Sequence, residues 1–188
     1  MNYLIDLDKE LLLLINKSWT NGFFDLFFPL ITDLHHTNAF KYIFVPGLIL
    51  FFVVYRKWNG AIFLGGLVSS LALNDFIGGK LIKPFFERPR PPVAGIEVIL
   101  RAPHFGGFSF TSNHASNMFC AAVFVTAFFP RMRWIMFAYA FLVAYSRVYC
   151  GVHYPSDVIF GALVGSLIGF MISRIFLLLR KRVAEKYG

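Results

Sequence analysis

The chain has 188 residues, of which 57% are hydrophobic, 19% aromatic and 15% charged, and its formal net charge is +8. The apolar fraction lies above, and the charged fraction below, the usual range of soluble globular domains. This composition argues against an ordinary soluble enzyme and indicates a chain whose solvent is a membrane.

The first 20 residues form a weakly amphipathic stretch rather than a targeting sequence. Asp6, Asp8 and Glu10 interrupt it before the apolar run, and it lacks the basic start and small-residue cleavage site of a signal peptide. A short interfacial helix on the membrane surface is therefore predicted.

Uncharged runs predict where the chain crosses the membrane. A spanning helix needs about 20 apolar residues, with a lower limit of about 17. Six runs meet or approach this length, at about 21–34, 39–55, 60–81, 112–129, 134–147 and 155–179. We predict an all-α fold, a six-transmembrane helical bundle with a short N-terminal interfacial helix, in a single domain over residues 1–188.

Six spans place both termini on one side of the membrane. More Lys and Arg residues fall on that side than on the other, so the positive-inside rule predicts cytoplasmic termini. The positive net charge is then explained by topology and does not indicate nucleic-acid binding. The remaining cations are predicted in and around an outer loop at about 84–111.

The outer loop begins KPFFERPRPP, in which Pro follows both Arg88 and Arg90. Proline restricts the preceding residue to extended backbone, so the arginines form a stiff cationic strip with Lys83 nearby. An ordinary basic loop that contacts lipid headgroups is the alternative. The positive-inside rule argues against it, because cations gather here on the outer side.

A second polar segment, SRVYCGVHYPSD, covers residues 146–157. Only 13 uncharged residues separate Arg133 from Arg147, so Arg147 is predicted below the membrane surface. Burying it costs about 2.5–3.5 kcal/mol, and it needs an anionic partner, for which Asp157 and a phosphate are both candidates. Pro155 suits the first position of the last helix, which places Asp157 in the opening turn beside His153.

Asp157 also shares a helix face with Gly161, Gly165 and Gly169. A glycine stripe allows close packing against a neighbouring helix. Asp157 is therefore predicted to face the bundle interior rather than lipid.

A third polar segment, FSFTSNHASNMF, places His114 where the fourth uncharged run begins. Ser112 lies near the N-cap of that helix, whose free backbone N–H groups and dipole favour an anion. His35 and His36, in the short first outer loop, are interpreted as ordinary solvated loop residues.

Together the three segments resemble the signature of the type 2 phosphatidic acid phosphatase family. The matching residues are Lys83, separated by six residues from Arg90-Pro91, then Ser112-Asn113-His114, then Ser146-Arg147 followed by His153 and Asp157. The resemblance implies an all-helical six-span phosphatase that uses no metal or other cofactor and works through a phosphohistidine.

The resemblance also implies roles for individual residues. His153 would attack phosphorus, Asp157 would orient its imidazole, and His114 would protonate the leaving oxygen. The phosphoryl oxygens would be bound by Lys83, Arg90, Ser112 and Arg147, and the side-chain amide of Asn113 is a further candidate donor to a phosphate oxygen or to the leaving group. The family usually has glycine at position 113, and the asparagine found here puts the local backbone geometry in question.

The predicted function is hydrolysis of a phosphate from a membrane lipid at the periplasmic face of a bacterial inner membrane. Lipid A 1-phosphate, phosphatidylglycerol phosphate and undecaprenyl diphosphate are the substrate classes that the resemblance implies. Three alternatives remain at this point: a lipid phosphotransferase with the same phosphohistidine, a non-catalytic protein that binds anionic lipid, and a metallohydrolase with His114, His153 and Asp157 as ligands.

Overall fold

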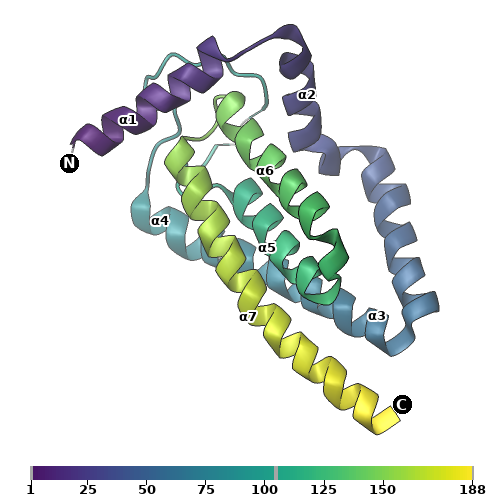
Figure 1. Cartoon of the computed structure of the whole chain (residues 1–188). Coiled ribbons are helices and arrows are strands. Elements are labelled where there is room, and N and C mark those ends of the chain that lie inside the picture. The colour runs from purple at the N-terminus through teal and green to yellow at the C-terminus, as the bar shows by residue number, and fades with distance from the viewer. Residues whose placement is uncertain (1, 104–105, 188) are drawn as a thin grey trace.

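The computed structural model of the chain describes residues 2–103 and 106–187. Within these residues every regular element is a helix, and α3, α5, α6 and α7 pack into one bundle (Figure 1). The predicted all-α fold is therefore confirmed.

The N-terminal segment forms α1 (Asn2–Leu13) and a π-helical turn, η1 (Leu14–Ser18), across one end of the bundle (Figure 1). Asp8 Oδ1 accepts a hydrogen bond of 2.9 Å from the backbone N–H of Ser156, at the start of α7. The Asn16 amide donates to the carbonyls of Ile99 and Tyr149 at 2.9 and 2.8 Å. The predicted N-terminal helix exists, and these contacts fix it to the bundle.

The next segment is a helical path with a break. It comprises α2 (Gly22–Asp33), the 3₁₀ turn η2 (Leu34–His36), the π-helical turn η3 (Phe40–Phe44) and the start of α3 (Val45–Phe76). The two halves, Gly22–His36 and Phe40–Val54, are bent by 42°. Thr37 holds the break, because its hydroxyl donates to the Leu34 carbonyl at 2.7 Å and accepts from the Phe40 N–H at 3.3 Å.

Helix α3 then folds back on itself at the far end of the bundle (Figure 1). The rings of Phe52 and Phe63 stack 4.6 Å apart, whereas a straight helix would separate these positions by about 16 Å. Gly60 allows the approach, since a Cβ there would lie 1.9 Å from the Phe52 carbonyl oxygen. The returning limb, Trp58–Phe86, includes η4 (Ile77–Ile82) and α4 (Lys83–Phe86).

The centre of the bundle is α5 (Asn113–Phe128), which packs against α6 (Arg133–Tyr149) and α7 (Pro155–Tyr187); the short turn η5 (Pro130–Met132) joins α5 to α6. A Cβ at Gly161 would lie 2.6 Å from the carbonyl oxygen of Ser112, the N-cap of α5, and a Cβ at Gly165 or Gly169 would lie 1.9 or 2.4 Å from a carbonyl oxygen within α5. The predicted packing role of the glycine stripe is thus confirmed, and Asp157 on the same face is fully buried.

Large apolar side chains cover the outside of the bundle. On α7, side chains that are about half exposed or more include Leu163, Leu167, Phe170 and Leu178. An outward apolar face of this extent suits hydrocarbon rather than water.

The prediction of exactly six spans is not confirmed. Among the described residues, two helices, Trp58–Phe86 and Pro155–Lys186, are long and apolar enough to cross a membrane, and the bent pair is a third if it counts as one span. Helices α5 and α6 have only 16 and 17 residues.

The prediction that both termini lie on one side of the membrane is not confirmed. The expected spans at 21–34 and 39–55 form one bent path, so the N-terminal helix lies where α7 begins and the C-terminus lies at the opposite end (Figure 1). Hydropathy detects two apolar runs here, but it cannot distinguish a bend of 42° from a reversal of direction.

Candidate active site

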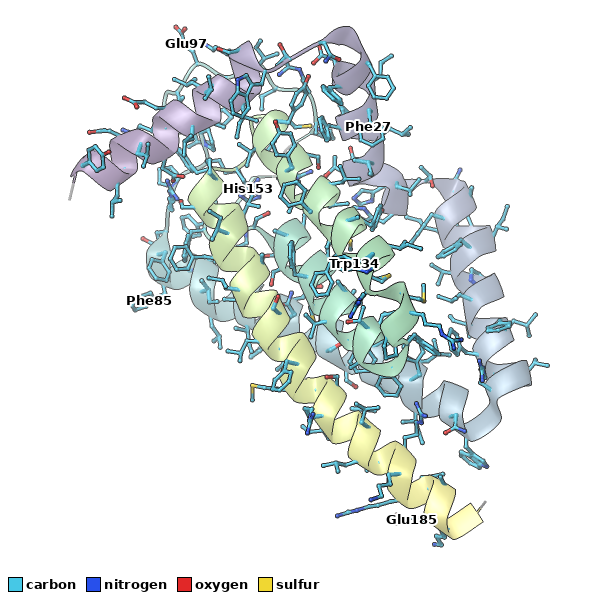
Figure 2. The ribbon with its side chains drawn as sticks, in the orientation of Figure 1. Phe27, Phe85, Glu97, Trp134, His153 and Glu185 are labelled. Carbon is cyan, nitrogen blue, oxygen red and sulfur yellow. The ribbon has the colours of Figure 1, made fainter. Side chains whose placement is uncertain are left out.

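His153 and Asp157 form a buried pair at the start of α7 (Figure 2 labels His153). His153 Nδ1 lies 3.4 Å from Asp157 Oδ2 and 3.3 Å from the Ser109 hydroxyl. Its Nε2 lies 3.3 Å from Arg90 Nη1, and because a guanidinium can only donate, Nε2 must be the accepting nitrogen. The proton is then on Nδ1, and the Nε2 lone pair is directed toward Arg90.

Burial lowers the pKa of His153 from its ordinary 6.5 to about 3, although the adjacent carboxylate of Asp157 opposes this shift. The imidazole is therefore neutral near pH 7. A neutral imidazole is the form that can act as a nucleophile.

Arg88, which the sequence analysis placed only in a cationic strip, joins this pair to the N-terminal helix. Its Nη1 donates to Asp157 Oδ1 at 2.7 Å, and its Nη2 donates to Asp8 Oδ2 at 2.6 Å. The guanidinium also lies 3.8 Å above the ring centroid of Tyr154. Asp157 therefore has its counter-cation in Arg88 and not in Arg147.

Three further cations approach the site from separate elements. Arg147 is buried, and its Nη1 donates to the Thr32 hydroxyl at 2.8 Å. Arg90 donates to the carbonyls of Gly106 and Val152 at 3.1 and 3.2 Å, and Lys83 Nζ donates to a backbone carbonyl of the outer loop at 2.9 Å. The acceptors in these hydrogen bonds are neutral, so they fix the three cations without compensating their positive charge.

The first turn of α5 contributes Ser112, Asn113 and His114. Ser112 is the N-cap residue, as predicted, but its hydroxyl caps nothing, and its backbone N–H donates to the Asp157 carbonyl at 3.0 Å. The Asn113 amide lies against Gly78, where a Cβ would be 3.2 Å from Oδ1. The glycine makes room for the side chain that replaces the family glycine at position 113.

Several buried polar atoms here have no hydrogen-bond partner among the described residues. They are Thr111 Oγ1, Ser112 Oγ, Asn113 Oδ1, His114 Nε2 and Arg147 Nε. An unpaired buried polar group costs about 1–3 kcal/mol, so a cluster of five is a feature of functional sites rather than of ordinary cores.

Three of these residues, Asn113, His114 and Arg147, line a cavity of about 150 Å³. Most of the predicted site residues line it, together with two residues of the α2 end. The lining residues are Asp33, His36, Lys83, Arg90, Pro103, Asn113, His114, Arg147 and His153. The structure therefore brings together side chains that lie more than 100 residues apart in the sequence.

Sequence reasoning missed Arg88, Ser109, Asp33 and His36. Arg88 carried a signal, because it repeats the Arg-Pro pattern of Arg90. His35 and His36 are exposed, as the solvated-loop interpretation predicts, but His36 also lines the cavity and the ring of His35 lies 5.4 Å from that of His114. Only the fold places this break beside the site.

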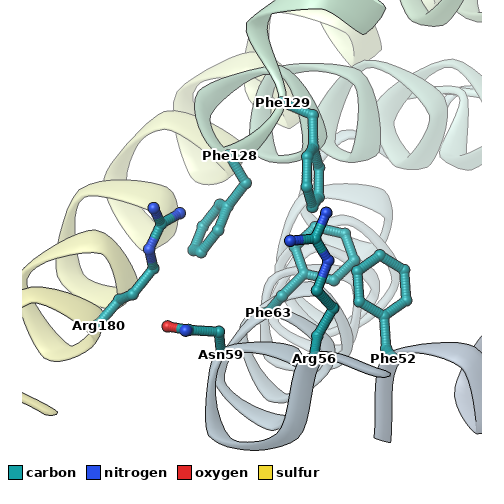
Figure 3. Close-up of a pocket in the computed structure, with 7 residues that line it drawn as sticks. All are labelled: Phe52, Arg56, Asn59, Phe63, Phe128, Phe129 and Arg180. Carbon is teal, nitrogen blue, oxygen red and sulfur yellow. The ribbon is translucent and has the colours of Figure 1, made fainter. Parts of the chain in front are cut away.

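A second cavity of about 150 Å³ lies at the opposite end of the bundle (Figure 3). It is lined by four phenylalanines, Asn59, Arg56 and Arg180, and no histidine or carboxylate is among its lining residues in the described part of the chain. Of these two cavities, only the first is therefore lined by groups that suit acid–base or nucleophilic chemistry. Within the described residues, no group of three or more His, Cys, Asp or Glu side chains is arranged to hold a metal ion.

Comparison with known proteins agrees with the family resemblance of the three sequence segments. The sequence pattern of the PAP2 superfamily matches residues 60–181. A lipid A 4'-phosphatase of Bacteroides thetaiotaomicron is 30% identical over 183 residues, which is 91% of this chain and 77% of that protein.

Two crystal structures share the fold. LpxE of Aquifex aeolicus superposes with a TM-score of 0.66 at 32% identity, covering 88% of this chain and 93% of that one. A PAP2-type phosphatidylglycerolphosphate phosphatase of Bacillus subtilis superposes with a TM-score of 0.70 at 25% identity, covering 100% of this chain and 89% of that one.

Proposed function

The chain belongs to the PAP2 superfamily and is a lipid phosphate phosphatase, and from that premise we propose that it works through a phosphohistidine on His153 without a metal. The observation that supports this most directly is the orientation of His153. Its Nδ1 lies beside Asp157, and its Nε2 lies beside Arg90 at the cavity. The imidazole is thus neutral, oriented and next to a cation that can hold a phosphate oxygen.

The proposed reaction has two steps. His153 Nε2 attacks phosphorus, the bond from phosphorus to the lipid oxygen breaks, and a proton on His114 passes to that oxygen. Water then attacks the phosphohistidine, the P–N bond breaks, and His114 recovers a proton from the water. The products are the lipid alcohol and inorganic phosphate.

The cations supply most of the stabilisation. Phosphoryl transfer spreads negative charge over three equatorial oxygens, and guanidinium forks and an ammonium match that charge. We assign Lys83, Arg90 and Arg147 to these oxygens, with Ser112 and Asn113 as hydrogen-bonding partners at the α5 N-terminus. The unpaired polar atoms of this turn support the assignment.

We propose the bacterial inner membrane as the location, with the site on the periplasmic side. The substrate belongs to the classes named for relatives and structural neighbours, which act on lipid A or phosphatidylglycerol phosphate. Undecaprenyl diphosphate is a third class, because a protein named undecaprenyl-diphosphatase is 34% identical over 134 residues.

The test is phosphate release from a panel of these lipids by the purified protein with chelator present. We expect release that persists in chelator, and a His153→Ala variant that is folded in detergent but inactive. Loss of activity in chelator would favour a metallohydrolase. A phosphorylated lipid acceptor would indicate a phosphotransferase, and binding without release would indicate a non-catalytic lipid-binding protein.

A further inference from the structure

The break between α2 and η3 carries Asp33 and His36 into the active-site cavity. We propose that this break is a leaving-group subsite, in which Asp33 accepts a hydrogen bond from a hydroxyl of the lipid alcohol next to the phosphoester. This inference rests on the proposed function and names the substrate class: lipid phosphates whose leaving group has a free hydroxyl.

The first support is that the Asp33 side chain does not cap a helical turn, although its position favours capping. It is the residue that precedes the 3₁₀ turn η2, a place where aspartate commonly caps backbone N–H groups. Its side chain makes no such bond, and it lines the cavity instead. Asp33 is also absent from every ion pair found among the described residues.

The second support is the side of the cavity on which the break lies. In an in-line transfer, the nucleophile and the leaving oxygen are on opposite sides of phosphorus. In the proposed reaction His153 is the nucleophile and His114 protonates the leaving oxygen, so His114 belongs to the leaving-group side. The His35 ring packs at 5.4 Å against that of His114, so the residues of the break lie on the leaving-group side.

Charge decides which part of a substrate Asp33 contacts. The cavity holds Lys83, Arg90 and Arg147, which suit the phosphate, whereas a carboxylate repels it. A carboxylate can only accept hydrogen bonds when ionised, so its partner must be a donor. The hydroxyls of a sugar or a glycerol are such donors, and a polyprenyl chain offers none.

The backbone of the break is held firmly enough to position Asp33. The preceding residue, Thr32, is buried and accepts from Arg147 at 2.8 Å, so the end of α2 is tied to a phosphate-binding cation. Thr37 fixes the other side of the break. Interrupted helices are tolerated within a membrane where they line a polar cavity, and this break does so.

The experiment compares two substrates that differ by one hydroxyl. They are phosphatidylglycerol phosphate and the analogue in which 1,3-propanediol replaces its headgroup glycerol, with identical acyl chains. For the wild type we expect kcat/KM to favour the hydroxylated lipid by about tenfold, as one hydrogen bond to a charged group implies. Asp33→Ala should abolish that preference by lowering kcat/KM for the hydroxylated lipid alone.

Asp33→Asn separates recognition from simple charge compensation of Arg147. Asparagine keeps an accepting oxygen, so this variant should retain part of the preference, whereas a purely electrostatic role would make it resemble Asp33→Ala. Asp6→Ala is the matched control, because Asp6 is exposed on α1 and pairs only with Lys9. It should behave as the wild type.

Two results would overturn the inference: an equal loss of kcat/KM on both lipids in Asp33→Ala, or a wild type that does not distinguish them. Absence of phosphate release from every lipid would contradict the proposed function instead. Thermal unfolding in detergent confirms that each variant is folded.

Discussion

Asp157 accepts hydrogen bonds from the Arg88 guanidinium, the Ser109 hydroxyl and the Tyr154 N–H, at 2.7, 2.5 and 3.0 Å. A carboxylate held by three donors has little freedom to move, so it fixes the ring of His153 in one orientation. Arg88 is fixed in turn by Asp8. We therefore regard Arg88 and Asp8 as positioning residues that act through Asp157.

We predict that Arg88→Met lowers kcat by about 10–100-fold, as the loss of a hydrogen bond between charged groups, worth about 1.5–3 kcal/mol, implies. KM should change little, because Arg88 does not line the cavity. Asp8→Asn should have a smaller effect, since Arg88 keeps its bond to Asp157. Steady-state kinetics measure both, with Lys17→Met as control because Lys17 belongs only to an exposed pair with Glu97.

The lowered pKa of His153 predicts the pH dependence of activity. Because its pKa in the folded protein is about 3 rather than 6.5, the imidazole stays neutral and nucleophilic as the pH falls from 7 to about 4. Any acid limb of kcat/KM in that interval should come from the substrate phosphate, whose second ionisation lies at about pH 6. Profiles measured with a monoester and a diphosphate should differ in midpoint, and a shared midpoint near 6.5 would contradict the prediction.

At the scale of single elements, some parts of the structure could be predicted from the sequence and others could not. Motif spacing predicted that His114 and His153 share a cavity and that Asp157 lies beside His153, because each lies at or next to a helix end and helix ends can be read from local signals. Asp33 could not be assigned in this way. Its role depends on a break whose position beside Arg147 is set by contacts across 115 residues of sequence.

The packing of α7 on α5 predicts the effect of filling one glycine. Gly165→Ala should lower the thermal midpoint in detergent, since the new Cβ would lie 1.9 Å from the Ser116 carbonyl oxygen and overpacking costs about 1–3 kcal/mol. Gly47→Ala is the matched control, because nothing lies within 4 Å of its Cβ and alanine favours a helix. Equal midpoints for the two variants would argue against close contact of α5 and α7.

At the scale of the whole molecule, the two ends of the bundle differ in their balance of acidic and basic side chains. At the site end, Arg88 pairs with Asp157 and Arg101 pairs with Asp25, 2.7 Å away in each case, whereas the cations that line the cavity have neutral hydrogen-bond acceptors. At the other end, Arg56 and Arg180 line a cavity without any ion-pair partner among the described residues (Figure 3). The end of α7 carries Arg180, Lys181 and Arg182 against one carboxylate, Glu185, and an excess of Lys and Arg is typical of the cytoplasmic side.

This charge pattern and the single bent path of residues 22–54 predict that the N-terminal helix faces the periplasm and the C-terminus the cytoplasm. Asp6→Cys and Glu185→Cys test this, since both native cysteines are buried and should not react. In spheroplasts, a membrane-impermeant maleimide should label Asp6→Cys at once and Glu185→Cys only after lysis. Glu97→Cys, whose side chain is 95% exposed at the site end, is the positive control. If neither Asp6→Cys nor Glu185→Cys were labelled before lysis, both termini would be cytoplasmic. The chain would then cross the membrane an even number of times, because only an even number of spans returns it to the side on which it began.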